Sequence, residues 1–111
     1  MLPSAKRLKR KKDFEMIFKN GRNFKGPFLV LKIVDNKRED NRFGFVVSQK
    51  ISKKATIRNQ VRRRLASGVK EMKNITPGND FLFLALPGIE KKEFIEVKDA
   101  ISQLVKKAGF K

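Results

Sequence analysis

Apolar and polar residues alternate along the chain with more than one period, and the first clear pattern is helical. Residues 11–20 place Phe14, Ile17 and Phe18 on one face of a helix, and Gly21 follows as a stop signal. The other residues of this segment are mostly polar or charged. The spacing therefore predicts a short amphipathic helix near the start of the chain.

Two longer helices are predicted further along the chain. Residues 57–73 carry an apolar stripe at spacings of three and four, formed by Ile57, Val61, Leu65, Val69 and Met72. Residues 91–108 carry a second stripe, formed by Phe94, Val97, Ile101, Leu104 and Val105, before Gly109. Both stripes indicate helices that lie with one face against a core.

Extended segments separate these helices. Residues 28–34 and 43–48 are predicted as strands that pair across a charged turn at residues 35–40. The continuous apolar run at residues 81–86 is typical of a strand covered on both faces, and the pattern leaves room for a further short strand near Phe24. The order helix, strand, strand, helix, strand, helix predicts an α+β fold, an α-β sandwich in which a small mixed sheet packs against helices.

The length of the chain fits one compact domain. The 111 residues, 40% of them hydrophobic, suffice for a core without cross-links. We therefore expect a single domain over residues 1–111, with residues 1–10 as a loosely ordered basic arm. The chain has no cysteine, which excludes disulfides and thiolate metal sites, fits a reducing compartment and leads us to expect a cytoplasmic location.

Charge is the strongest global feature. Lys and Arg total 28 against 11 Asp and Glu, a formal net charge of +17. Self-repulsion of this size opposes compaction, so an anionic partner is expected: nucleic acid, an anionic membrane surface or an acidic protein. No apolar run approaches the ~20 residues of a membrane span, and the basic start MLPSAKRLKRKKDF is not followed by an apolar signal core.

Residues 57–65, IRNQVRRRL, combine dense positive charge with the apolar stripe of the second helix. On a helix, Asn59 and Arg63 lie away from the apolar stripe and Arg62 lies at its edge. Arg58, in contrast, lies within the stripe. An arginine in that sector of the first turn indicates that the helix start overhangs a groove that Arg58 lines. Asn59 is placed to orient a neighbouring arginine or to contact a nucleotide edge.

Two interpretations of this basic helix face stay open at this point. The first is an ordinary solvated face. The second is phosphate binding, in which phosphate oxygens between Arg58 and Arg62 convert their repulsion into forked, charge-assisted hydrogen bonds. The net charge and the neighbouring lysines favour phosphate binding.

All ten aromatic residues are phenylalanine. Phe14 and Phe18 lie one turn apart on the first helix, where they either pack on the sheet or form a stacking surface for unpaired bases. Phe43 and Phe45 share one strand face and would extend that surface if no helix covers it, and Gly44 between them indicates a bulge or a close backbone approach. The aromatic residues expected in the core are Phe81, Phe83 and Phe94.

The sequence lacks the usual residues of a protein active site. It has no histidine, which excludes Ser–His and Cys–His nucleophilic sites and histidine metal ligation. The carboxylates of residues 35–40 alternate with basic residues, and those of the last helix are expected to pair with lysines on the surface; these are Glu90, Glu93, Glu96 and Asp99. If this chain serves a reaction, a partner is expected to perform the chemistry.

The segment RFGFVVSQKISKKATIRNQVRRRL at residues 42–65 resembles the bacterial ribonuclease P protein subunit. That family carries a strand ending near V-S-K-K, a short basic connection and a helix beginning R-N-x-x-K-R. The matching residues are Val47, Ser48, Lys50, Arg58, Asn59, Arg62 and Arg63. Residues 8–21, LKRKKDFEMIFKNG, are similar to the family's opening L-x-x-x-x-D-F-x-x-V-F-x-x-G. The resemblance covers nearly the whole chain, with departures at Leu31, Gln49, Gln60 and Ala66.

The resemblance implies a fold and a role for each matching residue. The middle helix of the family crosses between parallel strands with left-handed sense. The residues that would contact a catalytic RNA are Arg58, Asn59, Arg62, Arg63, Lys53 and Lys54. The residues that would border a cleft for the 5′ leader are Phe14, Phe18, Ser48 and Lys50.

The resemblance also implies a function. In that family a catalytic RNA removes the 5′ leader of precursor tRNA with Mg²⁺, which the RNA mainly holds, and the small protein binds both RNAs and is inactive alone. A ribosome-associated or general RNA-binding protein is the alternative. A DNA-binding protein that uses residues 57–73 as a recognition helix is a third hypothesis, but no compact second helix precedes this one at helix-turn-helix spacing.

Overall fold

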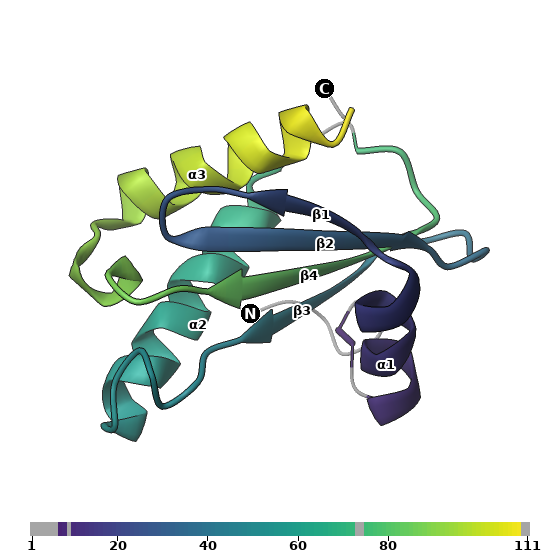
Figure 1. Ribbon diagram of the computed structural model, residues 1–111. Helices are drawn as coiled ribbons and strands as arrows, with labels where there is room; N and C mark the ends of the chain where they lie inside the picture. Colours follow the sequence, from purple (N-terminus) through teal and green to yellow (C-terminus); the bar gives the residue numbers. More distant parts are fainter. Residues whose placement is uncertain (1–6, 9, 73–74, 110–111) are drawn as a thin grey trace.

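The computed structural model describes residues 7–8, 10–72 and 75–109 (Figure 1). Its elements follow one another as α1 (Lys11–Asn20), β1 (Arg22–Lys25), β2 (Leu29–Asp35), β3 (Arg42–Val46), α2 (Ala55–Lys70), β4 (Asn79–Ala85), the 3₁₀ turn η2 (Ile89–Lys91) and α3 (Phe94–Lys107). The predicted α+β fold is confirmed, and β1 is the short strand expected near Phe24. Within the described chain, no helix is long and apolar enough to cross a membrane.

The four strands form one mixed sheet in the order β1-β2-β4-β3. β2 pairs antiparallel with both β1 and β4, whereas β3 pairs parallel with β4. The predicted hairpin between residues 28–34 and 43–48 is therefore wrong. The apolar strand β4 needs cover on both faces and takes the central place between β2 and β3, and that long-range pairing leaves no trace in the local pattern of the turn.

The connection from β3 through α2 to β4 is left-handed. In Figure 1 both strands point to the left, β4 lies above β3, and α2 passes behind the sheet. A path that leaves β3, returns behind the sheet and rises to β4 turns in the left-handed sense. Such connections are rare, because a right-twisted strand normally leads into a right-handed crossover.

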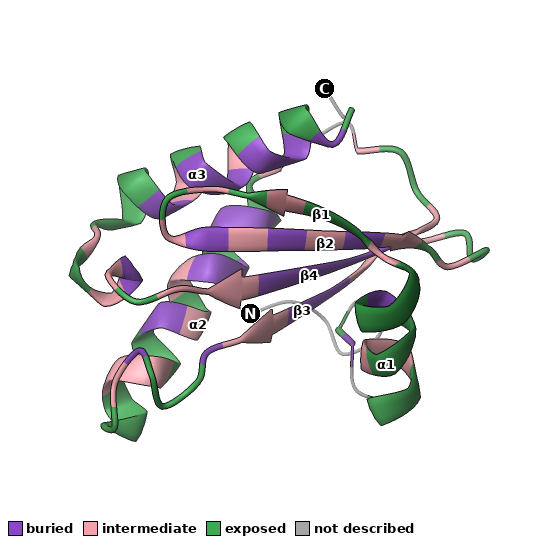
Figure 2. Ribbon diagram, in the orientation of Figure 1, coloured by how far each residue is buried: buried purple, intermediate pink, exposed green. Residues whose placement is uncertain are grey.

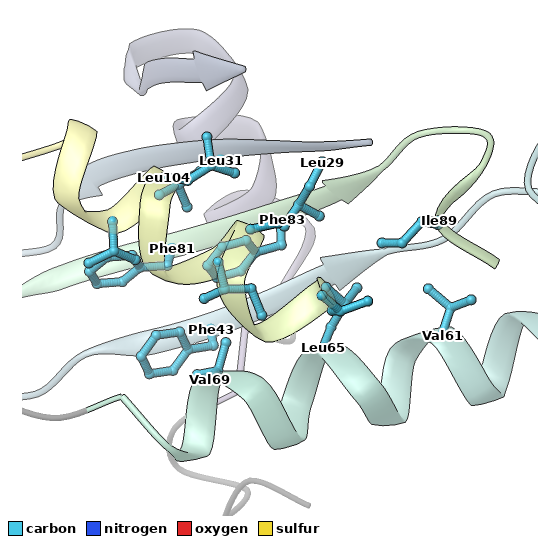
Figure 3. Close-up of a cluster of buried hydrophobic side chains, with 14 of the residues drawn as sticks. Leu29, Leu31, Phe43, Val61, Leu65, Val69, Phe81, Phe83, Ile89 and Leu104 are labelled. Carbon is cyan, nitrogen blue, oxygen red and sulfur yellow. The ribbon is translucent and has the colours of Figure 1, made fainter. Parts of the chain in front are cut away.

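The main core lies between the sheet and the helices α2 and α3. Phe81 and Phe83 of β4 are fully buried there, and they stack on Phe43 and Phe45 of β3 at centroid distances of 5.1 and 6.0 Å. Figure 3 shows Phe43 and Phe81 between the sheet and Val69 of α2. Because α2 covers this face, Phe43 and Phe45 lie on the opposite side of the sheet from Phe14 and do not join a ring surface with Phe14 and Phe18.

The opposite face of the sheet carries the smaller core under α1. Leu8, Ile17 and Leu82 form it, and Figure 2 shows a single buried band on an otherwise largely exposed α1. Gly44 of β3 allows Leu8 to approach, because a Cβ there would lie 3.0 Å from Leu8 Cδ1. Of the bulge or close backbone approach predicted at Gly44, the strand register shows no bulge, and the groups that approach the Gly44 backbone are the side chains of Leu8 and Leu82.

Part of the expected arm at residues 1–10 is described, and it is ordered by β3. Leu8 N donates to Phe43 O at 2.8 Å, Arg7 bridges Phe43 in parallel, and Leu8 is only 7% exposed. Residues 1–6 and 9 lie outside the described residues. The described part of the segment therefore extends the sheet at its β3 edge.

The last helix begins later than the pattern predicts, at Phe94 instead of residue 91. Glu93 and Glu96 form a capping box, in which each side chain accepts the backbone N–H of the other residue. Both carboxylates therefore cap the helix instead of pairing with lysines. Phe94 is 36% exposed, so its prediction as a core residue is wrong.

Candidate nucleic-acid interface

Helix α2 presents one apolar face to the sheet and leaves its arginines on the other sides. Val61, Leu65 and Val69 are buried in the main core, which confirms the stripe predicted for this helix. The helix starts two residues earlier and ends three residues earlier than predicted. Lys53 and Lys54 lie exposed directly before its first turn, and Lys54 is the N-cap residue.

Arg58 binds the chain's own backbone. Its Nη1 donates to the carbonyl oxygen of Ser52 at 2.9 Å, and the side chain is half-buried. The sequence pattern predicted that Arg58 lines a groove, and it did not predict this bond to the loop before the helix. The guanidinium instead ties the first turn of α2 to the loop before it, which explains how an arginine occupies the apolar sector.

Asn59 and Arg63 lie exposed on the outward surface of the same helix, and half-buried Arg62 lies beside them. Arg62 donates from Nη2 to Asn59 Oδ1 and approaches the carbonyl oxygen of Val47 at 3.5 Å. Asn59 thus orients Arg62, one of the roles predicted for it. Arg63 is exposed and makes no hydrogen bond or ion pair with the described residues.

The positive charge of this surface is not neutralised within the chain. The ion pairs between described residues join Arg38 to Asp40, Arg42 to Asp13 and to Asp80, and Lys98 to Glu71. None of them includes Arg58, Arg62 or Arg63. A run of arginines that meets no carboxylate is available to phosphate oxygens, for which the guanidinium fork is well matched.

The second candidate surface is the part of the sheet that α1 leaves open. The strand register places Lys25, Val30, Leu84 and Val46 in one row across this face. Val30, Leu84 and Val46 are only half-buried. Because side chains alternate along a strand, Lys32 lies on the same face as Val30. None of these positions was among the predicted site residues, although the same alternation could have been used to predict them.

Phe18 and Lys32 meet at the border between α1 and the open face. Lys32 Nζ lies 5.3 Å from the centroid of the Phe18 ring and donates to Asn23 Oδ1. Phe18 is 53% exposed, whereas Phe14 is half-buried and packs on the smaller core. Of the two early rings, Phe18 therefore offers an accessible surface and Phe14 mainly anchors the helix.

Ser48 and Lys50 lie in the turn after β3, and both are exposed. Ser48 Oγ accepts a hydrogen bond from the backbone N–H of Lys50 at 3.3 Å. Figure 1 places this turn at the end of the sheet opposite α1. The two rings of α1 and the turn after β3 therefore lie at opposite ends of the sheet.

Arg42 fixes the position of α1 on the sheet. Its guanidinium donates to Asp13 of α1 and to Asp80 of β4, and Asn36 Nδ2 also donates to Asp80 Oδ1 at 2.8 Å. The hydrogen bond to Asp80 is the main reason that the pKa of Arg42 is raised above its ordinary value. The sequence analysis did not predict this cluster. Asp80 could have indicated it, because an aspartate near the start of a strand buried on both faces needs a charged partner.

The described residues include no group of three or more side chains suited to hold a metal ion. The two candidate surfaces thus offer guanidinium groups, lysines, one accessible ring and an apolar sheet face. Chemically, guanidinium and ammonium groups suit phosphate oxygens, and an accessible ring suits the face of an unpaired base.

Comparison with known proteins identifies the family. The family model described as Ribonuclease P matches residues 2–109 of this chain. The chain belongs to the ribonuclease P protein family. The ribonuclease P protein component of Syntrophomonas wolfei is 32% identical over 110 residues, covering 98% of this chain and 92% of that protein. That of Synechocystis is 33% identical over 113 residues, covering 97% and 89%.

Solved ribonuclease P proteins share the fold. The protein from Thermotoga maritima superposes with a TM-score of 0.82 at 27% identity, covering 91% of this chain and 96% of that one. The protein from Staphylococcus aureus gives a TM-score of 0.86 at 24% identity, covering 96% and 97%. Membership of the ribonuclease P protein family implies participation in an RNA-processing ribonucleoprotein and partnership with an RNA subunit.

Proposed function

We propose that this chain binds the catalytic RNA of ribonuclease P through α2 and the 5′ leader of precursor tRNA through the open sheet face. The particle removes the leader to give the mature 5′ end of tRNA. The RNA carries out the chemistry with Mg²⁺ that it mainly holds itself, and the protein alone is inactive.

One observation carries this proposal: among the described residues, no carboxylate forms an ion pair with the arginines of α2 or with Lys25 and Lys32 at the open sheet face. Along α2, Arg63 is exposed and Arg62 is half-buried, and the exposed Lys53 and Lys54 directly precede the helix. A structured RNA presents phosphates at close, regular spacing, and each neutralised phosphate releases counterions, so such a surface supports binding that weakens steeply with salt.

The open sheet face supports a different kind of contact. Its floor of Val30, Leu84 and Val46 is apolar, while Phe18 and Lys32 stand at its border. An unpaired strand can place bases on the ring and the apolar floor and its phosphates near the lysines. A paired stem cannot use this face in that way, because its bases are already stacked.

Cleavage of precursor tRNA at limiting Mg²⁺ tests the proposal, with the catalytic RNA alone, the protein alone and the two together. We expect the protein to stimulate cleavage by the RNA and to cleave nothing by itself. The variant Arg62→Ala/Arg63→Ala should need more protein for half-maximal stimulation. The matched control Lys106→Ala/Lys107→Ala removes the same charge from exposed positions on α3 and should behave like wild type. Absence of stimulation by the wild-type protein would refute the proposed function.

A further inference from the structure

A groove of about 420 Å³ runs along β3, which follows β4 at one end of the strand order. Its walls come from the N-terminal segment, α1, β3 and α2. The lining residues are Arg7, Leu8, Phe14, Phe43, Gly44, Phe45, Asn59, Arg62, Arg63 and Ala66. The volume falls within the range of about 300–1,000 Å³ for sites that hold small organic molecules. This groove shares Phe14 with the α1 border but none of the open-face row described above.

More than half of the residues that line the groove are apolar or glycine. Leu8, Phe14 and the backbone of Gly44 line it from the side of α1, and the half-buried ring of Phe45 lines it from the side of α2. Ala66 closes the wall on α2. It is buried but lies outside the main core cluster, so its small side chain leaves space in the groove instead of filling the core.

The rim of the groove is cationic. Arg7, Arg62 and Arg63 line it, and no carboxylate is among its lining residues. Asn59, Arg62, Arg63 and Ala66 recur at spacings of three and four, so a single face of α2 supplies the whole wall. Asn59 Oδ1 accepts from Arg62, and this leaves its amide N–H groups for an acceptor inside the groove.

We propose that this groove takes one unstacked nucleobase of the RNA partner, with the adjoining phosphates on Arg62 and Arg63. The apolar walls suit the faces of a base, Asn59 donates to an oxygen or ring nitrogen on its edge, and the arginines neutralise the backbone. A base within a duplex is already stacked on both sides, so the groove selects an unpaired nucleotide. The inference rests on the proposed function, because it names what α2 recognises in the RNA besides phosphate.

The protein alone provides the first test. ¹⁵N-labelled protein is titrated with adenosine 5′-monophosphate and, separately, with ribose 5-phosphate, which has the same sugar and phosphate but no base. We expect the amide signals of Gly44 and Ala66 to shift with the nucleotide, and the nucleotide to bind about tenfold more tightly than ribose 5-phosphate, because only the nucleotide has a base that can stack. Equal affinity for both probes would overturn the proposal.

Variants of α2 locate the binding. Ala66→Leu fills the groove and should reduce nucleotide affinity to that of ribose 5-phosphate, whereas Ala66→Ser keeps the space and should bind like wild type. Ser67→Leu adds the same bulk at the next, exposed position and is the matched control. Asn59 is exposed, so Asn59→Ala should fold normally. This variant should lower the affinity for adenosine 5′-monophosphate and leave the affinity for ribose 5-phosphate unchanged, which keeps the test decisive if Ala66→Leu does not fold. Unchanged nucleotide binding in Ala66→Leu or Asn59→Ala would contradict the assignment.

Binding to the catalytic RNA completes the test. Ala66→Leu should bind this RNA about tenfold more weakly than Ser67→Leu, with the same dependence on salt, because no charge has been removed. Equal RNA affinities of the two variants would overturn the proposal. Failure of the wild-type protein to stimulate cleavage would instead refute the proposed function. The nucleotide titration uses the protein alone, so it would still show whether the groove binds a nucleobase.

Discussion

Arg42 and Asp80 form a forked ion pair beneath the first helix. Arg42 Nε lies 2.9 Å from Asp80 Oδ1, and Nη2 lies 2.7 Å from Oδ2. The same guanidinium reaches both carboxylate oxygens of Asp13 on α1, each at 3.2 Å. Because Asp80 is only 3% exposed, this cluster joins α1 to the sheet from inside and sets where Phe18 stands beside the open face.

Replacement of Arg42 by Met is predicted to lower the free energy of unfolding by about 3–5 kcal/mol, because the buried Asp80 loses its charged partner. Urea denaturation measures the change. The control Arg38→Met breaks the exposed pair with Asp40 and should cost no more than about 1 kcal/mol. If both variants lost a similar amount of unfolding free energy, the burial of Asp80 would not explain the contribution of Arg42 to stability.

Gly44→Ala is predicted to destabilise the protein by about 1–3 kcal/mol, since the new Cβ would lie 3.0 Å from Leu8 Cδ1 and 3.2 Å from Leu82 Cδ1. The double variant Gly44→Ala/Leu8→Ala removes part of this crowding. Its loss should therefore be smaller than the sum of the two single losses, measured by urea denaturation. A strictly additive result would mean that Leu8 does not pack on Gly44 in solution.

Arg63→Ala should reduce the slope of log affinity against log salt for the catalytic RNA by about one unit. Its stability should stay within about 0.5 kcal/mol of wild type, because Arg63 is exposed and bonds to no described residue. Arg58→Ala should lose stability by about 1.5–3 kcal/mol, since it removes a charged hydrogen bond to Ser52 O. Binding titrations at several salt concentrations, beside urea denaturation, separate the two roles. A stability loss in Arg63→Ala as large as in Arg58→Ala would contradict the distinction.

Phe18→Ala is predicted to weaken binding of an unpaired 5′ leader by about 1–3 kcal/mol, with little change in the salt slope. The matched control is Met16→Ala, which truncates another exposed apolar side chain on nearly the opposite side of α1. Fluorescence anisotropy with a labelled leader measures both. Equal weakening by the two variants would remove Phe18 from the proposed leader surface.

The pattern of apolar and polar residues predicted the helices and most strands, because those elements depend on residues close together in the sequence. The first helix begins and ends where its apolar spacing and Gly21 indicate, and the central run of β4 is buried as its continuous apolar sequence requires. The pairing of β3 was mispredicted because a charged turn between two apolar runs is compatible with a hairpin. The preference of β4 for the central position acts over long sequence separations.

The candidate surfaces were predicted in part, and the limits have physical reasons. Helical geometry placed Asn59 and Arg63 on the outward side of α2, but it could not show that Arg58 folds back onto the Ser52 carbonyl. The open sheet face depends on strand register, so Val30 and Leu84 became neighbours only once the strand order was known. The cluster of Arg42 likewise joins residues far apart in the chain.

The most direct test of the two-surface account is the affinity of the reconstituted particle for precursor tRNA relative to mature tRNA. With wild-type protein, the precursor should bind more tightly than mature tRNA by a larger ratio than with the catalytic RNA alone. Phe18→Ala should reduce that ratio, while Arg62→Ala/Arg63→Ala should weaken assembly of the particle and leave the ratio unchanged once assembly is saturated. A ratio that is the same with and without the protein would contradict the account.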